Sequence, residues 1–451
     1  MNPEKQSMKR TFIKYVVPSI LSQWVYALYT MVDGMFVAKG VGAQALTAVN
    51  LSTPFLQSLF ALSLLFAAGT STVAAIFLGE GKRKRASEVF TQNVAVQIIL
   101  SAAIIAAVLP NLGLLVRFLG ARDAQTAENM REYLSMIVPF VPGFLLSYAF
   151  EVLMKTDGFP RRTMGIVLTG ALENCLLDWL FVIVLHKGLA GAAFATSVSQ
   201  CTVTLLYLLH FLKGRGNIRF VRFKPDLPVL VREMGNGASA ALTELSAGAI
   251  TLIFNRAIAA LLFPDALVSY AIVSYINSIV VFSVTGIVQG SQPLISYCLG
   301  RGDRAGCRRL LRYCLAAALA FCAGTVLVCA LLGRKIASFY IGPDMPELLD
   351  YSAAVIRTFM LSFPLLGLNI ALSGYFAAVE YAFSAVLLSV GRSFVFLILS
   401  LGLLTGLLGG PGIWWAPLLS EGLCFGAACI LMPAARRRSL SRAARLRSQA
   451  G

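Results

Sequence analysis

The chain alternates between long apolar runs and short polar segments, most of which are basic. A helix that crosses the hydrocarbon core of a bilayer needs about 20 predominantly apolar residues. Runs of this kind occur twelve times, so the pattern predicts an all-α integral membrane protein with twelve transmembrane helices. The predicted helices cover residues 12–38, 46–78, 90–116, 133–154, 163–185, 189–212, 234–262, 267–297, 310–332, 352–378, 382–405 and 411–433.

The positive charges between these runs predict how the chain is oriented. Lys and Arg are enriched in short loops on the cytoplasmic side of a membrane. With the N-terminus placed inside, 28 Lys and Arg residues fall in cytoplasmic segments and 8 fall in outer segments. We therefore expect a multi-pass protein of the cell (inner) membrane with both termini in the cytoplasm.

A short internal repeat divides the predicted helices into two sets of six. Residues near the ends of the second and eighth helices match at a constant offset of 221 positions, and each set leads through an L-G-x-G turn into a basic loop. Halves that repeat in parallel orientation are found in transporters that work by alternating access. The matching pairs are Gly69 with Gly290, Leu78 with Leu299, Gly79 with Gly300, Gly81 with Gly302 and Arg83 with Arg304.

The repeat predicts two six-helix lobes related by a pseudo-twofold axis. The segment between them is basic and contains Pro225 and Pro228, as expected of a linker. The predicted divisions are an N-lobe over residues 1–212, a cytoplasmic linker over 213–233, a C-lobe over 234–433 and a basic cytoplasmic tail over 434–451.

Composition agrees with a membrane protein and excludes several other classes. Hydrophobic residues make up 58% of the chain and charged residues 13%, whereas soluble domains have about 45–50% and about 25%. The net charge is +17, and most basic residues form short clusters between the apolar runs, so they predict membrane orientation and no nucleic-acid partner. The nine cysteines form no C-x-x-C pair. No catalytic or structural metal motif is present, and we expect no enzymatic activity.

Four polar side chains inside the predicted N-lobe are candidates for a cation-coupling site. They are Asp33 in the first helix, Asn174 and Asp178 in the fifth, and Thr196 in the sixth. A charged side chain within a span costs about 2.5–3.5 kcal/mol on insertion scales, so it is usually functional. Each residue also has a simpler interpretation: Asp33 as a cap of the turn at the outer interface, Asn174 and Asp178 as a packing contact between helices, and Thr196 as a bond to its own backbone.

Depth in the membrane favours a shared site. A rise of 1.5 Å per residue places Asp33, Asp178 and Thr196 in the outer half of a core about 30 Å thick. Together they would form an oxygen-rich pocket for a proton shared between carboxylates or for a dehydrated Na⁺. Pro18, fifteen residues before Asp33, lacks an N–H and predicts a bend point in the first helix.

The predicted substrate cavity rests on weaker signals. Glu244 in the seventh helix would attract a cation, although it could instead pair with an arginine such as Arg256, Arg357 or Arg392. Glu421 is a further acid in the same half, and Glu151 and Lys155 have the i,i+4 spacing of a local salt bridge. Aromatic rings suit flat organic cations. The other predicted cavity residues are Gln57, Tyr148, Tyr275 and Gln289.

Several motifs in order along nearly the whole chain resemble the multidrug and toxic compound extrusion (MATE) family. The stretch at 157–160, D-G-F-P, is similar to the bacterial MepA-like branch. The motifs are D-G-M-F-V-A at 33–38, G-x-x-A-L-T-A-V-N at 42–50, K-T-D-G-F-P-R-R-T-M at 155–164, E-N-C-L-L-D-W at 173–179 and G-L-A-G-A-A-F-A-T at 188–196.

The resemblance implies a two-lobe antiporter that exports cationic drugs in exchange for protons or sodium. It assigns the N-lobe coupling site of the family to Asp33, Asn174, Asp178 and Thr196, and the helix-bending proline to Pro18. Some members also carry an acid in the tenth helix. None occurs here between residues 352 and 379, which places the expected coupling site in the N-lobe.

The sequence therefore predicts a secondary active multidrug efflux transporter in the lipid bilayer. Its expected partners are small cationic or amphipathic organic compounds, its coupling ion is H⁺ or Na⁺, and we expect it to act as a monomer without any cofactor. The alternative is a flippase or exporter of lipid-linked saccharide precursors, which would need a strongly cationic cavity for a diphosphate. A membrane enzyme would need a catalytic motif, and the sequence contains none.

Overall fold

The computed structural model describes residues 7–121, 123–342 and 344–448, and of residues 43 and 434–448 it describes the backbone alone. Every regular element in this part of the chain is helical. Lys5 and Arg122, the side chains of the predicted basic tail and its last three residues lie outside the described part. The elements are α1 (Met8–Gly40), α2 (Ala43–Gly79), α3 (Arg83–Val108), η2 (Leu109–Asn111), α4 (Leu112–Phe118), α5 (Ala124–Ile137), η3 (Val138–Phe140), α6 (Val141–Thr156), α7 (Pro160–Asp178), η4 (Trp179–Val184), α8 (Gly188–Leu212), α9 (Leu227–Leu261), α10 (Ala266–Gly300), α11 (Arg304–Ala337), α12 (Pro346–Phe359), η5 (Met360–Ser362), α13 (Phe363–Ala378), α14 (Ala382–Val390), η6 (Gly391–Val395), α15 (Phe396–Leu408) and α16 (Gly412–Ser448).

These elements form twelve long helical rods, because short 3₁₀ or π segments connect consecutive helices without a loop. Within the described residues, eleven rods are long and apolar enough to cross a membrane. The remaining rod, α1, is 33 residues long but carries many polar side chains. It packs against α7 and α10. The prediction of an all-α fold with twelve membrane-spanning helices is confirmed, with α1 as the most polar of the twelve.

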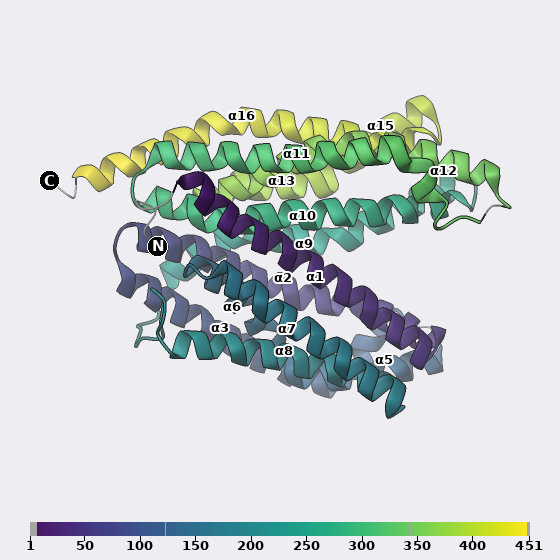
Figure 1. Cartoon of the computed structure of the whole chain (residues 1–451), viewed down its shortest axis with the longest axis horizontal. Coiled ribbons are helices and arrows are strands. Elements are labelled where there is room, and N and C mark those ends of the chain that lie inside the picture. Colours follow the sequence, from purple (N-terminus) through teal and green to yellow (C-terminus); the bar gives the residue numbers. More distant parts are fainter. Residues whose placement is uncertain (1–6, 122, 343, 449–451) are drawn as a thin grey trace.

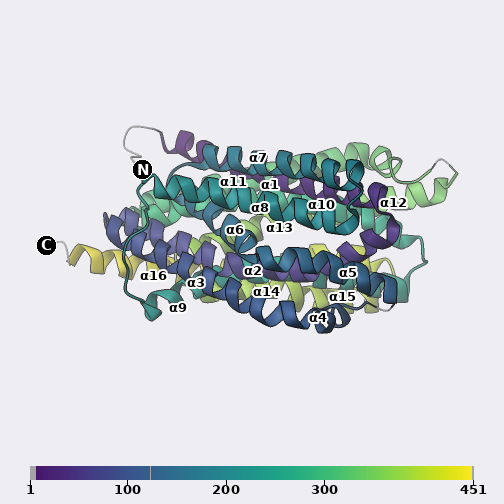
Figure 2. The ribbon, with the colours of Figure 1, turned by 90° about the horizontal axis from the view of Figure 1, so that it is seen from below.

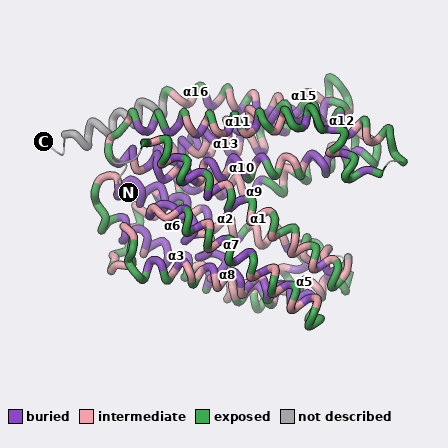
Figure 3. Tube along the Cα trace, viewed as in Figure 1, coloured by how far each residue is buried: buried purple, intermediate pink, exposed green. Residues whose placement is uncertain are grey.

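Apolar side chains cover much of the outer surface of the bundle. Leu114, Leu331 and Leu407 are each at least 70% exposed, and Figure 3 shows exposed positions along the outer faces of the rods. A soluble monomer rarely exposes apolar patches of such extent. In a bilayer these side chains face lipid, which adds to the case made by helix length.

The rods form two bundles that correspond to the two halves of the chain. Figure 1 shows helices α2–α8 on one side and α9–α16 on the other, with α1 crossing obliquely between them and both termini at the same end. The rods run along the long axis in both views (Figure 2). The bundles lie close together near the termini and diverge toward the opposite end (Figure 1). The predicted two-lobe architecture is therefore confirmed.

Glycines of the internal repeat lie where the two lobes touch. A Cβ atom on Gly69 of α2 would lie 1.9 Å from the carbonyl oxygen of Glu233 in α9, and one on Gly290 of α10 would lie 2.8 Å from the Cα of Val16 in α1. The α2–α9 and α10–α1 crossings are thus equivalent contacts of the two halves. Only glycine allows helix backbones to approach so closely in a membrane.

The two L-G-x-G turns also have a common structural reason. Gly81 has φ of +77° and Gly302 has φ of +70°, a left-handed conformation that favours glycine at the end of a helix. These turns lead into α3 and α11, and Asp303 caps α11 by accepting a hydrogen bond from the Gly306 amide at 2.8 Å. The repeat therefore encodes both a turn and a contact between lobes.

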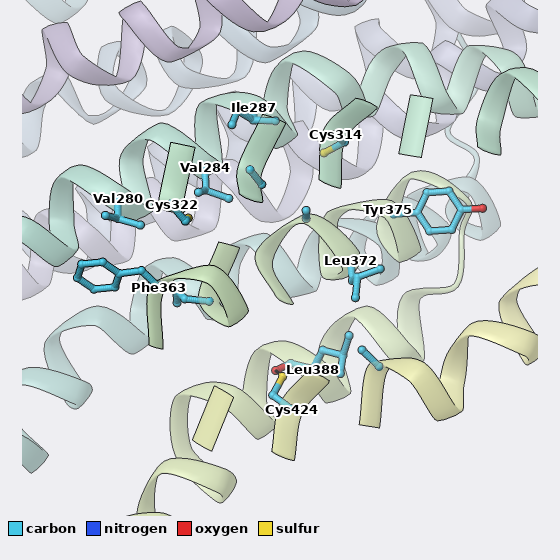
Figure 4. Close-up of a cluster of buried hydrophobic side chains, with 14 of the residues drawn as sticks. Val280, Val284, Ile287, Cys314, Cys322, Phe363, Leu372, Tyr375, Leu388 and Cys424 are labelled. Atoms are coloured by element: carbon cyan, nitrogen blue, oxygen red, sulfur yellow. Dashed lines mark hydrogen bonds between the residues drawn. The ribbon is translucent and has the colours of Figure 1, made fainter. Parts of the chain in front are cut away.

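The C-lobe has an extensive apolar core. Figure 4 shows side chains from five helices packed together in it, with Val280 and Ile287 from α10, Cys322 from α11, Phe363 from α13 and Cys424 from α16 among them. The cysteines are free thiols packed as small apolar side chains.

The helix boundaries differ from the prediction mainly at polar ends. The fourth rod begins at Ala124 rather than at residue 133, and α9 begins at Leu227, inside the predicted linker. Polar first turns, capped by Asp123 and Asp226, lengthen these helices beyond the apolar runs from which we predicted them. The division into lobes, linker and tail at the stated residues stays a prediction.

Candidate functional site

Two carboxyl groups from separate helices meet inside the N-lobe. Asp33 lies near the C-terminal end of α1, Asp178 is the last residue of α7, and these two helices pack against each other. The two carboxyl groups are close enough to influence each other electrostatically. Asp178 is fully buried. The chain continues from Asp178 into the π-helical segment η4, a distortion often found at functional sites. The two acids lie on neighbouring helices, and their predicted role as one shared coupling site stays a prediction.

The predicted amide and hydroxyl lie next to each other on the same side of the lobe. The Nδ2 atom of Asn174 donates to Oγ1 of Thr196 at 3.4 Å, which links α7 to α8. Both residues line a small cavity with room for about 20 Å³, roughly one water molecule. Tyr29 and Gln200 line it as well. A space of this size suits a single small cation or a water, not an organic substrate.

The carboxyl groups have no cationic partner. In the described part of the chain, no Lys, Arg or His forms an ion pair with Asp33 or Asp178, and both oxygens of Asp178 are buried without a hydrogen-bond donor. One oxygen each of Asp33 and Asn174 is in the same situation. Buried polar groups without partners are rare in proteins and call for an explanation. Oxygen atoms of this kind are the ligands of a hard cation or the acceptors of a proton.

Pro18 lies in the interior of α1 and is buried. Because proline has no N–H, the carbonyl of Lys14 one turn earlier receives no hydrogen bond from position 18. The Ser22 hydroxyl donates to the Pro18 carbonyl at 3.0 Å. The helix is therefore weakest between its N-terminal turns and the segment that carries Asp33. Bending at this point stays a prediction.

Comparison with known proteins now decides the family. The MatE family profile matches residues 18–180 and 240–403, one stretch in each lobe. This chain belongs to the MatE family. The predicted resemblance is confirmed.

Two curated relatives are similar over almost their whole length. They are multidrug export proteins named MepA, from Staphylococcus aureus (strain bovine RF122 / ET3-1), 24% identical, and from Staphylococcus saprophyticus, 22% identical. Each match covers 95% of this chain and 94% of the relative. Among solved structures, one described as the outward-facing conformation of a multidrug resistance MATE family transporter has a TM-score of 0.87 at 19% identity, covering 97% of both chains.

In this MatE family member, the ion pair between Glu151 and Lys155 is buried more deeply than its spacing in the sequence predicts. Lys155 and Glu151 of α6 are joined at 2.7 Å as the i,i+4 spacing predicts, but each side chain is only 1% exposed. The Tyr26 hydroxyl of α1 donates to Glu151 at 2.8 Å, and Lys155 donates to Gln289 of α10 at 3.2 Å. Gln23 of α1 also donates to Gln289, at 3.1 Å. The pair therefore connects α1 and the C-lobe.

Tyrosines connect this ion pair to the carboxyl site. The rings of Tyr26 and Tyr29, both in α1, lie with centroids 5.7 Å apart. The hydroxyl of Tyr29 lies close enough to Asp33 and Gln200 to interact with both. One face of α1 thus carries polar contacts from the paired acids to the contact between the lobes.

Four of the five predicted cavity residues lie near each other between the lobes. The Tyr148 hydroxyl lies beside Gln23 and Gln289, and Glu244 of α9 is close enough to act on it electrostatically. Gln57 of α2 lies 3.7 Å from where a Cβ on Gly248 would be, one turn after Glu244. Phe60 packs on Tyr148 at 5.6 Å. These residues would present one acid, two amides and aromatic rings to a ligand.

The fifth predicted residue lies elsewhere. Tyr275 is 55% exposed and stacks on Tyr340, which follows α11, with ring centroids 5.9 Å apart. Its position near the start of α10 puts it at the end of the bundle away from the termini, so it does not join the cavity group.

The alternative interpretation of Glu244 was an ion pair with an arginine, but the arginines have other surroundings. Arg392 lies 3.7 Å from Glu421, and Asn369 donates to the same carboxylate at 2.7 Å. Arg357 is exposed, and Glu244 forms no ion pair among the described residues. Glu421 is thus paired with an arginine, whereas Asp33, Asp178 and Glu244 form no ion pair among the described residues.

Proposed function

We propose that this chain is a secondary active multidrug efflux transporter that exchanges cationic or amphipathic organic compounds for protons or sodium by alternating access. The observation that carries the proposal is the proximity of Asp33 on α1 to Asp178 on α7, with buried carboxyl oxygens that have no hydrogen-bond or basic partner among the described residues. Two such carboxylates repel each other unless a proton or a metal cation lies between them. Occupancy by a cation therefore changes the energy of the contact between α1 and α7.

We place both termini in the cytoplasm of a cell whose inner membrane holds the protein, on the basis of the charge bias between loops. The lobes meet near the termini, so they are closed on the cytoplasmic side and spread on the outer side. This arrangement corresponds to an outward-facing state. A cation arriving from outside would then reach Asp33 and Asp178 first.

The proposed cycle uses α1 to connect the two sites. Cation binding draws Asp33 and Asp178 together, α1 bends near Pro18, and Tyr26 and Gln23 transmit the change to Glu151, Lys155 and Gln289 at the lobe contact. Release of the organic compound outward follows. A ligand can shift this equilibrium only by its different affinity for the two states, so the cation must bind the states unequally.

For the substrate we propose a site between the lobes that is formed by Gln57, Tyr148, Glu244 and Gln289. An unpaired glutamate attracts a positive charge, and aromatic faces bind flat cations. The named relatives are multidrug export proteins, which favours organic compounds over the lipid-linked saccharides of the flippase alternative. Arg392 is already paired with Glu421, so it is not free to bind a diphosphate.

The test is transport of a fluorescent organic cation in proteoliposomes, with proton and sodium gradients imposed separately. We expect one of the two gradients to drive uphill transport by the wild-type protein. Asp178→Asn removes the charge on which coupling depends and is expected to abolish gradient-driven transport.

Glu173→Gln is the matched control. Glu173 lies on the same helix and accepts a hydrogen bond from Thr202 at 2.9 Å, away from the paired acids. It should retain transport close to wild type. Full uphill transport by Asp178→Asn would reject the coupling site, and transport that ignores both gradients would reject antiport itself.

A further inference from the structure

A second hollow lies near the termini, away from the cation site and the space between the lobes. It has room for about 340 Å³, within the range of small-molecule sites, roughly 300–1,000 Å³. Its walls come from the start of α1, the α6–α7 turn, the linker after α8, and the ends of α10 and α11 that face them. Both lobes thus contribute to it. We call it the terminal pocket.

The polar side of the terminal pocket is basic. Lys14 and Arg215 line it, are exposed, and form no ion pair within the described residues. One acid, Asp157, also lines it, but its carboxylate is already engaged. It accepts hydrogen bonds from the backbone amides of Asn217 and Ile218 and contacts Nε2 of the His210 ring at 3.1 Å. The charges left free for a ligand are therefore positive.

The other side of the terminal pocket is apolar. Phe159, Leu294 and Leu310 line it, and the latter two are buried. A ligand held only by charge would leave this surface uncovered. A molecule with both an anionic group and a hydrocarbon portion would cover both sides.

An exposed apolar stripe leads from the pocket along α1. From Lys14 the same face of the helix continues through Val17, Leu21, Trp24 and Leu28, at alternating spacings of three and four residues, and all four are exposed. On a helix that spans a membrane, such a stripe faces acyl chains. Lys14 lies where the stripe begins, which is where a lysine reaches the headgroup layer.

We propose that the terminal pocket binds the headgroup of an anionic phospholipid from the cytoplasmic leaflet, with Lys14 and Arg215 contacting its phosphate and its acyl chains lying along α1. Basic pockets between helices on this side of a membrane bind such headgroups. Because the walls belong to both lobes, a bound lipid favours the state in which the lobes meet near the termini.

The experiment compares binding of phosphatidylglycerol and phosphatidylcholine, with identical acyl chains, to the purified full chain by native mass spectrometry. Each base near a membrane surface contributes about 1 kcal/mol of attraction, or about fivefold in affinity. Lys14→Gln and Arg215→Gln should each weaken binding of phosphatidylglycerol about fivefold and leave phosphatidylcholine unchanged. Lys213→Gln, an exposed base in the same linker that does not line the pocket, is the matched control and should change binding less than about twofold.

Three results would overturn the proposal. Equal affinity for the two lipids would show that charge is not recognised. An equal loss for Lys213→Gln would show diffuse attraction to a basic surface. Displacement of the lipid by glycerol 3-phosphate at similar concentration would assign the pocket to a soluble anion. Because the measurement is of binding and not of transport, its outcome is independent of the paired-carboxylate mechanism.

Discussion

At the scale of single residues, the role of a charged side chain depends on how deeply it is buried. The spacing of Glu151 and Lys155 correctly predicted a salt bridge but not its depth, because the covering side chains come from α1 and α10, far away in the sequence. The prediction that Tyr275 lines the cavity shows the opposite error. An aromatic residue suits a cavity, but the position of Tyr275 on α10 leaves it stacked on Tyr340. Residue type and local spacing do not predict which distant helix packs against a given side chain.

The buried ion pair yields a stability prediction. Lys155→Met leaves the Glu151 carboxylate buried without a cation, which costs about 3–5 kcal/mol of folding free energy. The double variant Glu151→Gln/Lys155→Met removes both charges and should recover most of that loss. Thermal unfolding followed by tryptophan fluorescence in detergent measures both. A double variant as unstable as Lys155→Met would show that the loss does not come from the unpaired acid.

At the scale of helices, apolar length predicted each rod, but not its exact ends or its internal distortions. The π segment η4 ends the fifth rod and η6 interrupts the eleventh, and nothing in the apolar pattern marks them. Pro18 in α1 is the exception, since a missing N–H is visible in the sequence. Its structural effect can be predicted because it is local.

Replacing Pro18 tests whether the weak point of α1 is needed for transport. Pro18→Ala restores an N–H that can bond to the Lys14 carbonyl, and a proline in a helix interior costs about 3 kcal/mol relative to alanine. We expect unchanged or higher thermal stability together with slower uphill transport in proteoliposomes. Wild-type transport by Pro18→Ala would show that bending of α1 at this residue is not required.

The helix crossing at Gly69 gives a second prediction at this scale. The methyl group of Gly69→Ala would overlap the Glu233 carbonyl, since their separation would be only 1.9 Å. Separating α2 from α9 should cost about 1–3 kcal/mol and lower the midpoint of thermal unfolding. Gly324→Ala is the control, because a Cβ there meets no atom within 4 Å. If both variants unfold at the same temperature, the close crossing does not stabilise the contact between the lobes.

At the scale of the whole molecule, the repeat proved the most informative sequence feature. An offset of 221 residues predicted two lobes, and its glycines mark equivalent crossings of α2 with α9 and of α10 with α1. The symmetry does not extend to chemistry. Among the described residues, Asp33 and Asp178 pair with no base, while Glu421 is paired with Arg392. The partner of Glu151 could be predicted from its i,i+4 spacing to Lys155, but the partner of Glu421 could not, because Arg392 lies on a different helical element.

The central claim is that Asp33 and Asp178 hold a cation that organic substrate displaces. The most direct measurement is cation release when substrate is added to purified protein, with a pH indicator in weak buffer for H⁺ and a sodium-sensitive indicator for Na⁺. We predict that the wild-type protein releases one of these ions in proportion to substrate bound. Asp178→Asn, shown by thermal unfolding to be folded, should release neither. Release from Asp178→Asn equal to that from the wild type would contradict the account.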